Sequence, residues 1–221
     1  MLTIPANLPS WKQAKYRMVQ SWQTLNQRCR IGQIVFTGSS LMEMFPVEKF
    51  AAEEGPDFPV VYNRGVGGWR TEDMLLCLDE MVLDLQPRRV FINIGTNDLS
   101  DRNVTIADLI GRYRQILTAI LAEVPGVEII LMAYYPINYD AAADEGMRAT
   151  LRIRTNERIA QANQAVAALA EELHLRFIDV NAPLKDDQGR LKAEYTIEGM
   201  HIHEAGYRAI WPLVKEEILN D

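Results

Sequence analysis

Residues 90–98 read VFINIGTND: an apolar run, then a glycine, then polar side chains that can take part in chemistry. A short apolar run that ends at a glycine is typical of a strand buried on both faces. Similar runs occur on either side of it along the chain. We therefore expect strands at residues 33–36, 60–62, 90–94, 128–135 and 176–180.

The segments between these strands carry apolar residues at the three- and four-residue spacing of amphipathic helices. They predict helices at residues 9–29, 71–85, 106–124 and 154–173, and a last helix from Glu204 onward. Ser10 and Thr71 are expected to cap the first two. Strands that alternate with helices predict an α/β fold, a three-layer sandwich whose five-stranded parallel sheet carries helices on both faces.

The length of the chain, 221 residues, favours one domain with a full hydrophobic core. We expect residues 1–221 to form a single domain, with about residues 1–30 as an N-terminal helical segment. The apolar residues of that segment are Trp11, Tyr16, Val19 and Trp22. Hydrophobic residues make up 48% of the chain and charged residues 24%, which excludes a disordered chain, a collagen-like repeat and a long coiled coil.

The charge balance bears on partners, because 23 Lys and Arg against 30 Asp and Glu give a net charge of -7. An acidic chain without a run of basic residues has no general attraction for phosphate backbones, so nucleic acid is not an expected partner. The most apolar stretch, residues 129–137, is too short to span a bilayer, and no basic amphipathic helix indicates membrane binding. The first residues lack a secretory signal pattern, so we expect a cytoplasmic protein. A homo-oligomer is neither indicated nor excluded.

The cysteines and histidines do not form a metal-binding pattern. Cys29 and Cys77 match no metal or redox spacing, and we expect both as small core residues in helical segments. Two free thiols suit a reducing compartment, and a bridge between them stays open. His201 and His203 share a face of an extended segment, but no further Cys or His cluster joins them. We expect no metal and no cofactor, with His203 at the surface or at the lip of a pocket.

Reactive side chains follow three of the expected strands and precede the last helix. They are Ser40, the glycine turn at residues 63–68, Asn97, and Glu198 with His201. Because the carboxyl ends of parallel strands meet at one edge of a sheet, we expect these residues to lie close together. Acyl transfer requires a serine, a base to take its proton, a group to orient the base, and N–H donors for an oxyanion.

In order and in spacing, over essentially the whole chain, these four blocks resemble those of the SGNH hydrolases, also called GDSL-type esterases and lipases. The resemblance implies a flavodoxin-like SGNH hydrolase fold and a serine esterase. It implies that Ser40 is the nucleophile and His201 the general base. It also implies an oxyanion hole made by the backbone N–H groups of Ser40 and Gly68 and the side-chain amide of Asn97.

The chain departs from the pattern of this family at two positions. Ser39 stands where the family has its name-giving aspartate, although the nucleophile after it is retained. Glu198 stands where the triad acid is normally aspartate. We expect Glu198 in that role, with a backbone carbonyl or another carboxylate as the alternative, because the acid is the triad member whose change is best tolerated.

Other readings of these residues are less well supported. The elbow of α/β-hydrolases, Gly-x-Ser-x-Gly, is absent because Met42 stands two residues after Ser40. The glycine turn does not match the dinucleotide-binding pattern. This mismatch also argues against the hypothesis that the protein is a nucleotide-binding switch. A ligand-binding module that has lost catalysis remains an alternative, for which Glu198 is the best support.

The substrate is less defined than the chemistry. Trp69, Tyr134 and Tyr135 follow or end expected strands and are candidates for a substrate wall, with core packing as the alternative. Residues 137–150 form a long loop after a strand and are a candidate lid. We expect a small-molecule ester with a short acyl group, such as an O-acetylated carbohydrate. A lysophospholipase or a thioesterase of the same family is the alternative.

Overall fold

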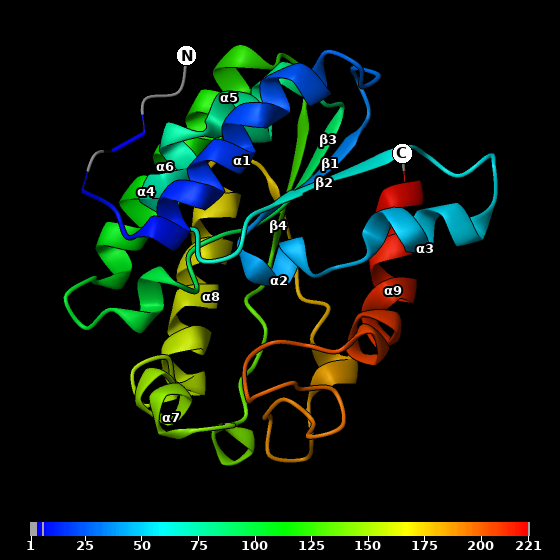
Figure 1. Ribbon diagram of the computed structural model, residues 1–221. Helices are drawn as coiled ribbons and strands as arrows, with labels where there is room; N and C mark the ends of the chain where they lie inside the picture. The colour runs from blue at the N-terminus through cyan, green and yellow to red at the C-terminus, as the bar shows by residue number, and fades with distance from the viewer. Residues whose placement is uncertain (1–3, 6, 221) are drawn as a thin grey trace.

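The structure is a computed structural model, which describes residues 4–5 and 7–220. Its sheet confirms the expected α/β sandwich (Figure 1). The strands are β1 Ile34–Gly38, β2 Val61–Gly65, β3 Arg89–Asn93, β4 Glu128–Met132 and β5 Arg176–Ile178. All neighbouring pairs are parallel, and their order is β2-β1-β3-β4-β5, the flavodoxin-like order of the SGNH hydrolase fold.

Helices cover both faces of the sheet. One face carries α1 Ser10–Asn26, α4 Thr71–Leu76, α5 Leu78–Met81, α6 Ile106–Glu123 and α8 Asn156–Glu172. The other carries α2 Ser40–Glu43, α3 Val47–Glu54 and α9 Glu204–Leu219 (Figure 1). The short remaining helices are α7 Glu145–Leu151 and the 3₁₀ turns η1 Leu83–Leu85, η2 Asp98–Ser100, η3 Tyr139–Ala141 and η4 Ala182–Leu184.

The strands read as continuous apolar runs because the sheet is buried on both sides. In β4, Ile129 and Leu131 pack into the core under α6 and α8, whereas Ile130 and Met132 pack into the core under α9. Burying an aliphatic side chain of this size stabilises the fold by roughly 1.5–3 kcal/mol. The two cores together hold the helical layers against the sheet.

Several expected boundaries were wrong. The helix expected at residues 71–85 is broken into α4, α5 and η1, because the backbone leaves helical geometry at Cys77 and Val82. Ser10 and Thr71 are the first helical residues rather than caps, and the hydroxyl of Thr71 donates to a carboxylate instead.

The segment that follows β4 also differs from the expectation. The chain leaves the sheet after Met132, so residues 133–135 are not strand. Residues 137–150 are not an irregular loop, since they contain η3 and the start of α7. Cys77 is buried as expected, but Cys29 lies beyond the end of α1 and is half-buried. Both thiols are free, so no bridge joins them.

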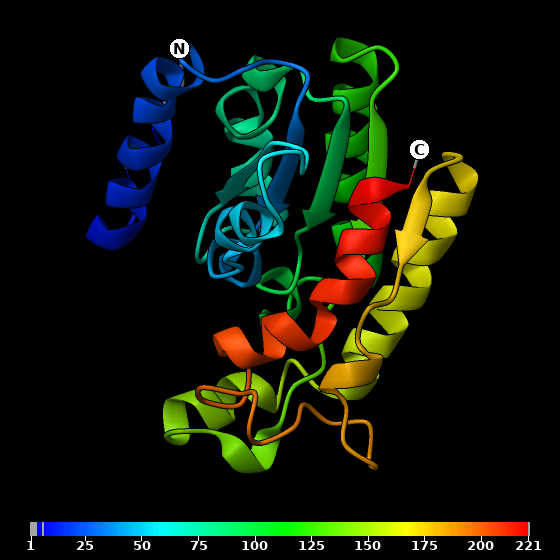
Figure 2. The same cartoon turned by 90° about the vertical axis from the view of Figure 1, so that its right-hand side faces the viewer.

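The carboxyl ends of the strands point to one edge of the sheet, where α7 and the segment before α9 gather (Figure 2). In the order β2-β1-β3-β4-β5, the chain leaves β1 toward one face and β3 toward the other. Ligands bind α/β sheets at such a switch point. Ser40 follows β1 and Asn97 follows β3, so both lie beside it.

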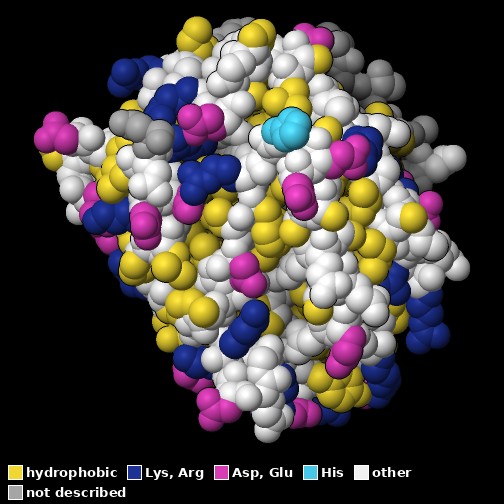
Figure 3. All heavy atoms as spheres, turned by 180° about the vertical axis from the view of Figure 1, so that it is seen from behind, with side chains coloured by type: hydrophobic (Ala, Val, Ile, Leu, Met, Phe, Trp, Pro, Cys, Tyr) yellow, Lys and Arg dark blue, Asp and Glu magenta, His cyan; other side chains and the backbone are white. Residues whose placement is uncertain are grey.

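The surface has mixed charge on the face seen from behind, where Lys and Arg side chains lie among Asp and Glu side chains (Figure 3). Among the described residues, no helix has both the length and the hydropathy needed to cross a membrane.

Candidate active site

Ser40 is the first residue of α2, directly after the end of β1. Two glycines permit this tight turn from strand to helix. Gly38 has a φ of 146°, and a Cβ there would lie 2.0 Å from the backbone oxygen of Asn93. A Cβ on Gly65 would lie 2.2 Å from the backbone nitrogen of Glu43, so α2 packs directly on the end of β2. The turn therefore holds Ser40 at the edge of the sheet.

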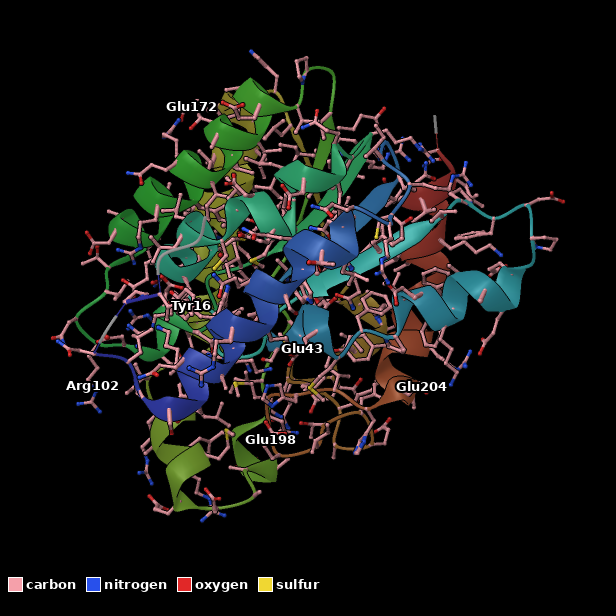
Figure 4. All side chains as sticks on the ribbon, turned by 45° about the horizontal axis from the view of Figure 1, so that its top comes forward. Tyr16, Glu43, Arg102, Glu172, Glu198 and Glu204 are labelled. Carbon is pink, nitrogen blue, oxygen red and sulfur yellow. The ribbon has the colours of Figure 1, made fainter. Side chains whose placement is uncertain are left out.

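His201 joins Ser40 to Glu198. Its Nε2 lies 2.9 Å from Ser40 Oγ, and its Nδ1 lies 2.6 Å from Glu198 Oε1. Because an ionised carboxylate only accepts hydrogen bonds, Nδ1 carries the proton and Nε2 is free to accept the Ser40 hydroxyl. The side chains of His201 and Glu198 are 23% and 14% exposed, so solvent reaches this pair. Figure 4 shows Glu198 beside the segment that leads into α9.

A tight turn brings Glu198 to His201. The backbone nitrogens of Ile197 and His201 donate to His201 O and Glu198 Oε1 respectively. Gly199 has a φ of 100°, and its nitrogen donates to Thr196 Oγ1 at 2.8 Å. Its carbonyl accepts from Asn138 N at 2.7 Å. The segment expected as a lid therefore supports this turn at its first residues.

The carboxyl group of Glu198 is charged at neutral pH. Burial raises its pKa, but the hydrogen bond and charge of His201, together with the charge of Arg154, lower it by more. The pKa of Glu198 consequently lies below its ordinary value of 4.5. A charged carboxylate at Nδ1 can stabilise an imidazolium, which is what a triad acid must do.

The three N–H groups expected to form the oxyanion hole belong to Ser40, Gly68 and Asn97. Neither Ser40 N nor Gly68 N donates to any backbone acceptor within the part of the chain that the structure describes. The Asn97 amide donates to Trp69 O at 2.9 Å, while its Oδ1 accepts from Arg154 Nη2 at 2.8 Å. These two contacts fix the orientation of the amide and leave the second proton of Nδ2 for another acceptor.

A buried carboxylate joins the two loops that carry Gly68 and Asn97. Asp98 is fully buried directly after Asn97, and it accepts hydrogen bonds from the backbone nitrogen and hydroxyl of Thr71, at 3.1 and 2.6 Å. Arg112 Nη2 donates to the same carboxylate at 3.0 Å. Since Thr71 lies three residues after Gly68, Asp98 ties the loop after β3 to the glycine turn.

The three candidates for a substrate wall follow the alternative, which was core packing. Trp69, Tyr134 and Tyr135 are each at most 1% exposed, so their side chains belong to the core. Trp69 packs on Tyr16 with ring centroids 4.7 Å apart, and Tyr134 donates its hydroxyl proton to Ile94 O at 2.7 Å. Rings this large are stabilised more by full burial than by lining an open site.

An aromatic side chain that the sequence pattern did not indicate does lie at the site. Trp11 on α1 is 54% exposed. A Cβ on Gly68 would lie 2.9 Å from Trp11 Cζ3, so the indole lies against the glycine that carries one of the N–H donors. The position of Trp11 depends on how α1 docks on the sheet. The spacing of apolar residues within α1 does not predict that docking.

Among residues that the structure describes, no three His, Cys, Asp or Glu side chains come together as a metal site. His203 is exposed immediately before α9. The arrangement therefore consists of a hydroxyl, an imidazole and a carboxylate joined by hydrogen bonds.

Comparisons with known proteins show the family of the chain. Residues 44–209 match the GDSL-like Lipase/Acylhydrolase family, a range that contains the glycine turn, Asn97, Glu198 and His201 and begins after Ser40. A comparison with curated proteins returned no match.

Solved structures share the fold over most of the chain. A protein from Streptococcus pneumonia assigned as a platelet activating factor is 29% identical, with a TM-score of 0.81 and 92% of each chain covered. A GDSL-like lipase from Bacteroides thetaiotaomicron is 23% identical, with a TM-score of 0.74, covering 90% of this chain and 96% of that one. A catalytic mutant of an acetylxylan esterase from Geobacillus stearothermophilus is 19% identical, with a TM-score of 0.64 and coverages of 88% and 97%. The family match spans most of the chain, and the protein therefore belongs to the GDSL-like lipase and acylhydrolase family, whose members are esterases and lipases.

Proposed function

We propose that this protein is a serine esterase that hydrolyses carboxylic esters through an acyl-enzyme. The observation that carries the proposal is the continuous chain of hydrogen bonds from Glu198 through His201 to Ser40, at 2.6 and 2.9 Å. Nucleophile and base within hydrogen-bond reach, with the base oriented by a third group, are the signature of an activated serine. A binding module without catalysis has no need for this alignment.

The reaction proceeds in two halves. His201 Nε2 takes the Ser40 proton as Oγ forms a bond to the ester carbonyl carbon, and the N–H groups of Ser40, Gly68 and Asn97 receive the oxyanion. The imidazolium then returns its proton to the departing alcohol as the C–O bond breaks, which leaves the acyl group on Ser40. Water attacks that ester with His201 again as base, and carboxylic acid and free Ser40 result.

For the substrate we propose a small ester with a short acyl group, such as an O-acetylated carbohydrate. Trp11 supports this class, because its exposed indole beside Gly68 offers a flat surface on which a sugar ring can pack. A neighbour of the same fold is an acetylxylan esterase, so the fold accommodates such a reaction. A lysophospholipase or thioesterase is the second candidate, and esters from acetyl to decanoyl separate the two.

Replacing Ser40 with Ala should lower kcat for p-nitrophenyl acetate by about 10⁴–10⁶, because no other group can form the acyl-enzyme. Release of p-nitrophenol at neutral pH measures it. Ser39→Ala is the matched control, since the Ser39 hydroxyl is buried and faces Thr96 Oγ1 at 3.5 Å. Wild-type turnover in Ser40→Ala would refute the nucleophile.

Replacing Glu198 with Gln should lower kcat by about 10²–10⁴, because the neutral amide cannot stabilise the imidazolium. Since the folded-state pKa of Glu198 lies below 4.5, its pair with His201 adds stability that is present above that pH. This stability is lost as the pH falls through the lowered pKa. Urea denaturation at about pH 6 should therefore show a larger deficit for Glu198→Gln than denaturation at about pH 3.

The matched variant is Glu198→Asp, which keeps the carboxylate and should retain more activity than Glu198→Gln. A kcat for Glu198→Gln equal to that of the wild type would mean that another group orients His201.

Replacing Trp11 with Ala should raise KM for acetylated xylose about 2- to 10-fold, the equivalent of a lost aromatic contact of roughly 0.5–1.5 kcal/mol. The kcat for p-nitrophenyl acetate should change little, because the Trp11 side chain takes no part in the proton transfers and donates no hydrogen bond to the oxyanion. Leu25→Ala removes another exposed apolar side chain of α1 and is the control. An unchanged KM in Trp11→Ala would remove the indole from the substrate site.

A further inference from the structure

Arg154 is a buried cation behind the candidate oxyanion donors. It lies in the turn between α7 and α8, and only 3% of its surface is exposed. The nearby carboxylates have other partners, since Asp98 pairs with Arg112 and Glu198 pairs with His201. Burying a charge costs free energy unless the charge is paired and hydrogen-bonded. The burial of the Arg154 guanidinium therefore has to be offset by the contacts that it makes.

Two of the side-chain contacts of Arg154 reach residues of the candidate site or next to it. Its Nη2 donates to Asn97 Oδ1 and its Nε to Ser100 Oγ, both at 2.8 Å. Its Nη1 lies against the sulfur of Met200, the residue before His201. One guanidinium therefore touches both the Asn97 amide, the proposed oxyanion donor, and the turn that carries the base.

Arg154 remains charged in this environment. Burial lowers its pKa to about 10, while the charges of Asp98 and Glu198 act in the opposite direction. At neutral pH a full positive charge accordingly lies behind the Asn97 amide.

We infer that Arg154 is a positioning residue for ester hydrolysis, acting through the Asn97 amide, and this inference rests on the proposed esterase function. The guanidinium on Oδ1 prevents the amide from flipping, which keeps Nδ2 as the donor directed to Trp69 O and to the proposed oxyanion. It also draws electron density from the amide oxygen, which makes the remaining N–H a stronger donor. The buried charge becomes more favourable as negative charge develops on the substrate oxygen, so the effect is larger in the transition state than in the ground state.

The same contacts could serve only to hold α8 against the loop after β3, and a double-mutant cycle separates the two roles. Arg154→Met should lower kcat for p-nitrophenyl acetate about 10- to 100-fold with little change in KM, less than the 10²–10³ expected for Asn97→Ala. If Arg154 acts through Asn97, the double variant should be about as slow as Asn97→Ala alone. A purely structural role predicts that the two losses multiply.

Arg158→Met is the matched control, because Arg158 lies on α8 and donates to the carbonyls of Asp101 and Val104 without touching Asn97. Its kcat should stay at the wild-type level. Arg154→Lys keeps the charge and should fall between the wild type and Arg154→Met, and it also provides a folded variant if Arg154→Met unfolds in a thermal melt.

Failure of the Arg154 proposal can be told apart from failure of the esterase proposal. Multiplicative losses in the cycle, or a kcat for Arg154→Lys or Arg154→Met equal to that of Arg158→Met, would overturn the role of Arg154 while the esterase proposal stands. A wild-type protein that hydrolyses no ester in a series from acetyl to decanoyl would overturn both.

Discussion

One hydrogen bond joins parts of the chain that are 161 residues apart: the contact between His201 Nε2 and Ser40 Oγ. Ser40 is fixed by β1 and by the glycines that let α2 pack on the sheet. His201 is fixed from the other side, because α9 follows it at once and is anchored to α2. The hydroxyl of Tyr207 donates to the carbonyl of Leu41 at 2.7 Å, in a fully buried contact. The alignment of base and nucleophile therefore depends on how α9 docks.

The polar groups behind the site form connected layers rather than separate pairs. Asp98 links the loop after β3 to the glycine turn, and Arg154 links that loop to the turn that carries His201. Buried polar networks of this kind are stabilising only when each member is satisfied, and they then hold a unique geometry. A rigid set of donors requires little reorganisation when an oxyanion forms, which is the physical basis of electrostatic catalysis.

The fold was predictable because its strands are buried on both faces, so that β1, β3 and β4 stand out as short apolar runs. The site was predictable where local sequence dictates it: Ser40 follows a strand-ending glycine, and the three-residue spacing of Glu198 and His201 fits one turn. The contributions of Trp11 and Arg154 were not predictable, because each depends on a contact with a residue more than fifty positions away. The choice between core and substrate wall for Trp69 stayed open for the same reason, since its partner Tyr16 lies on α1.

The central claim is that Ser40 is a nucleophile activated by His201. Its most direct test is to treat the native protein with a fluorophosphonate and to identify the modified peptide by mass spectrometry. We expect a single adduct on Ser40 and much slower labelling in a His201→Ala variant. An unlabelled protein, or an adduct on another residue with Ser40 unmodified, would contradict the account and favour a binding module without catalysis.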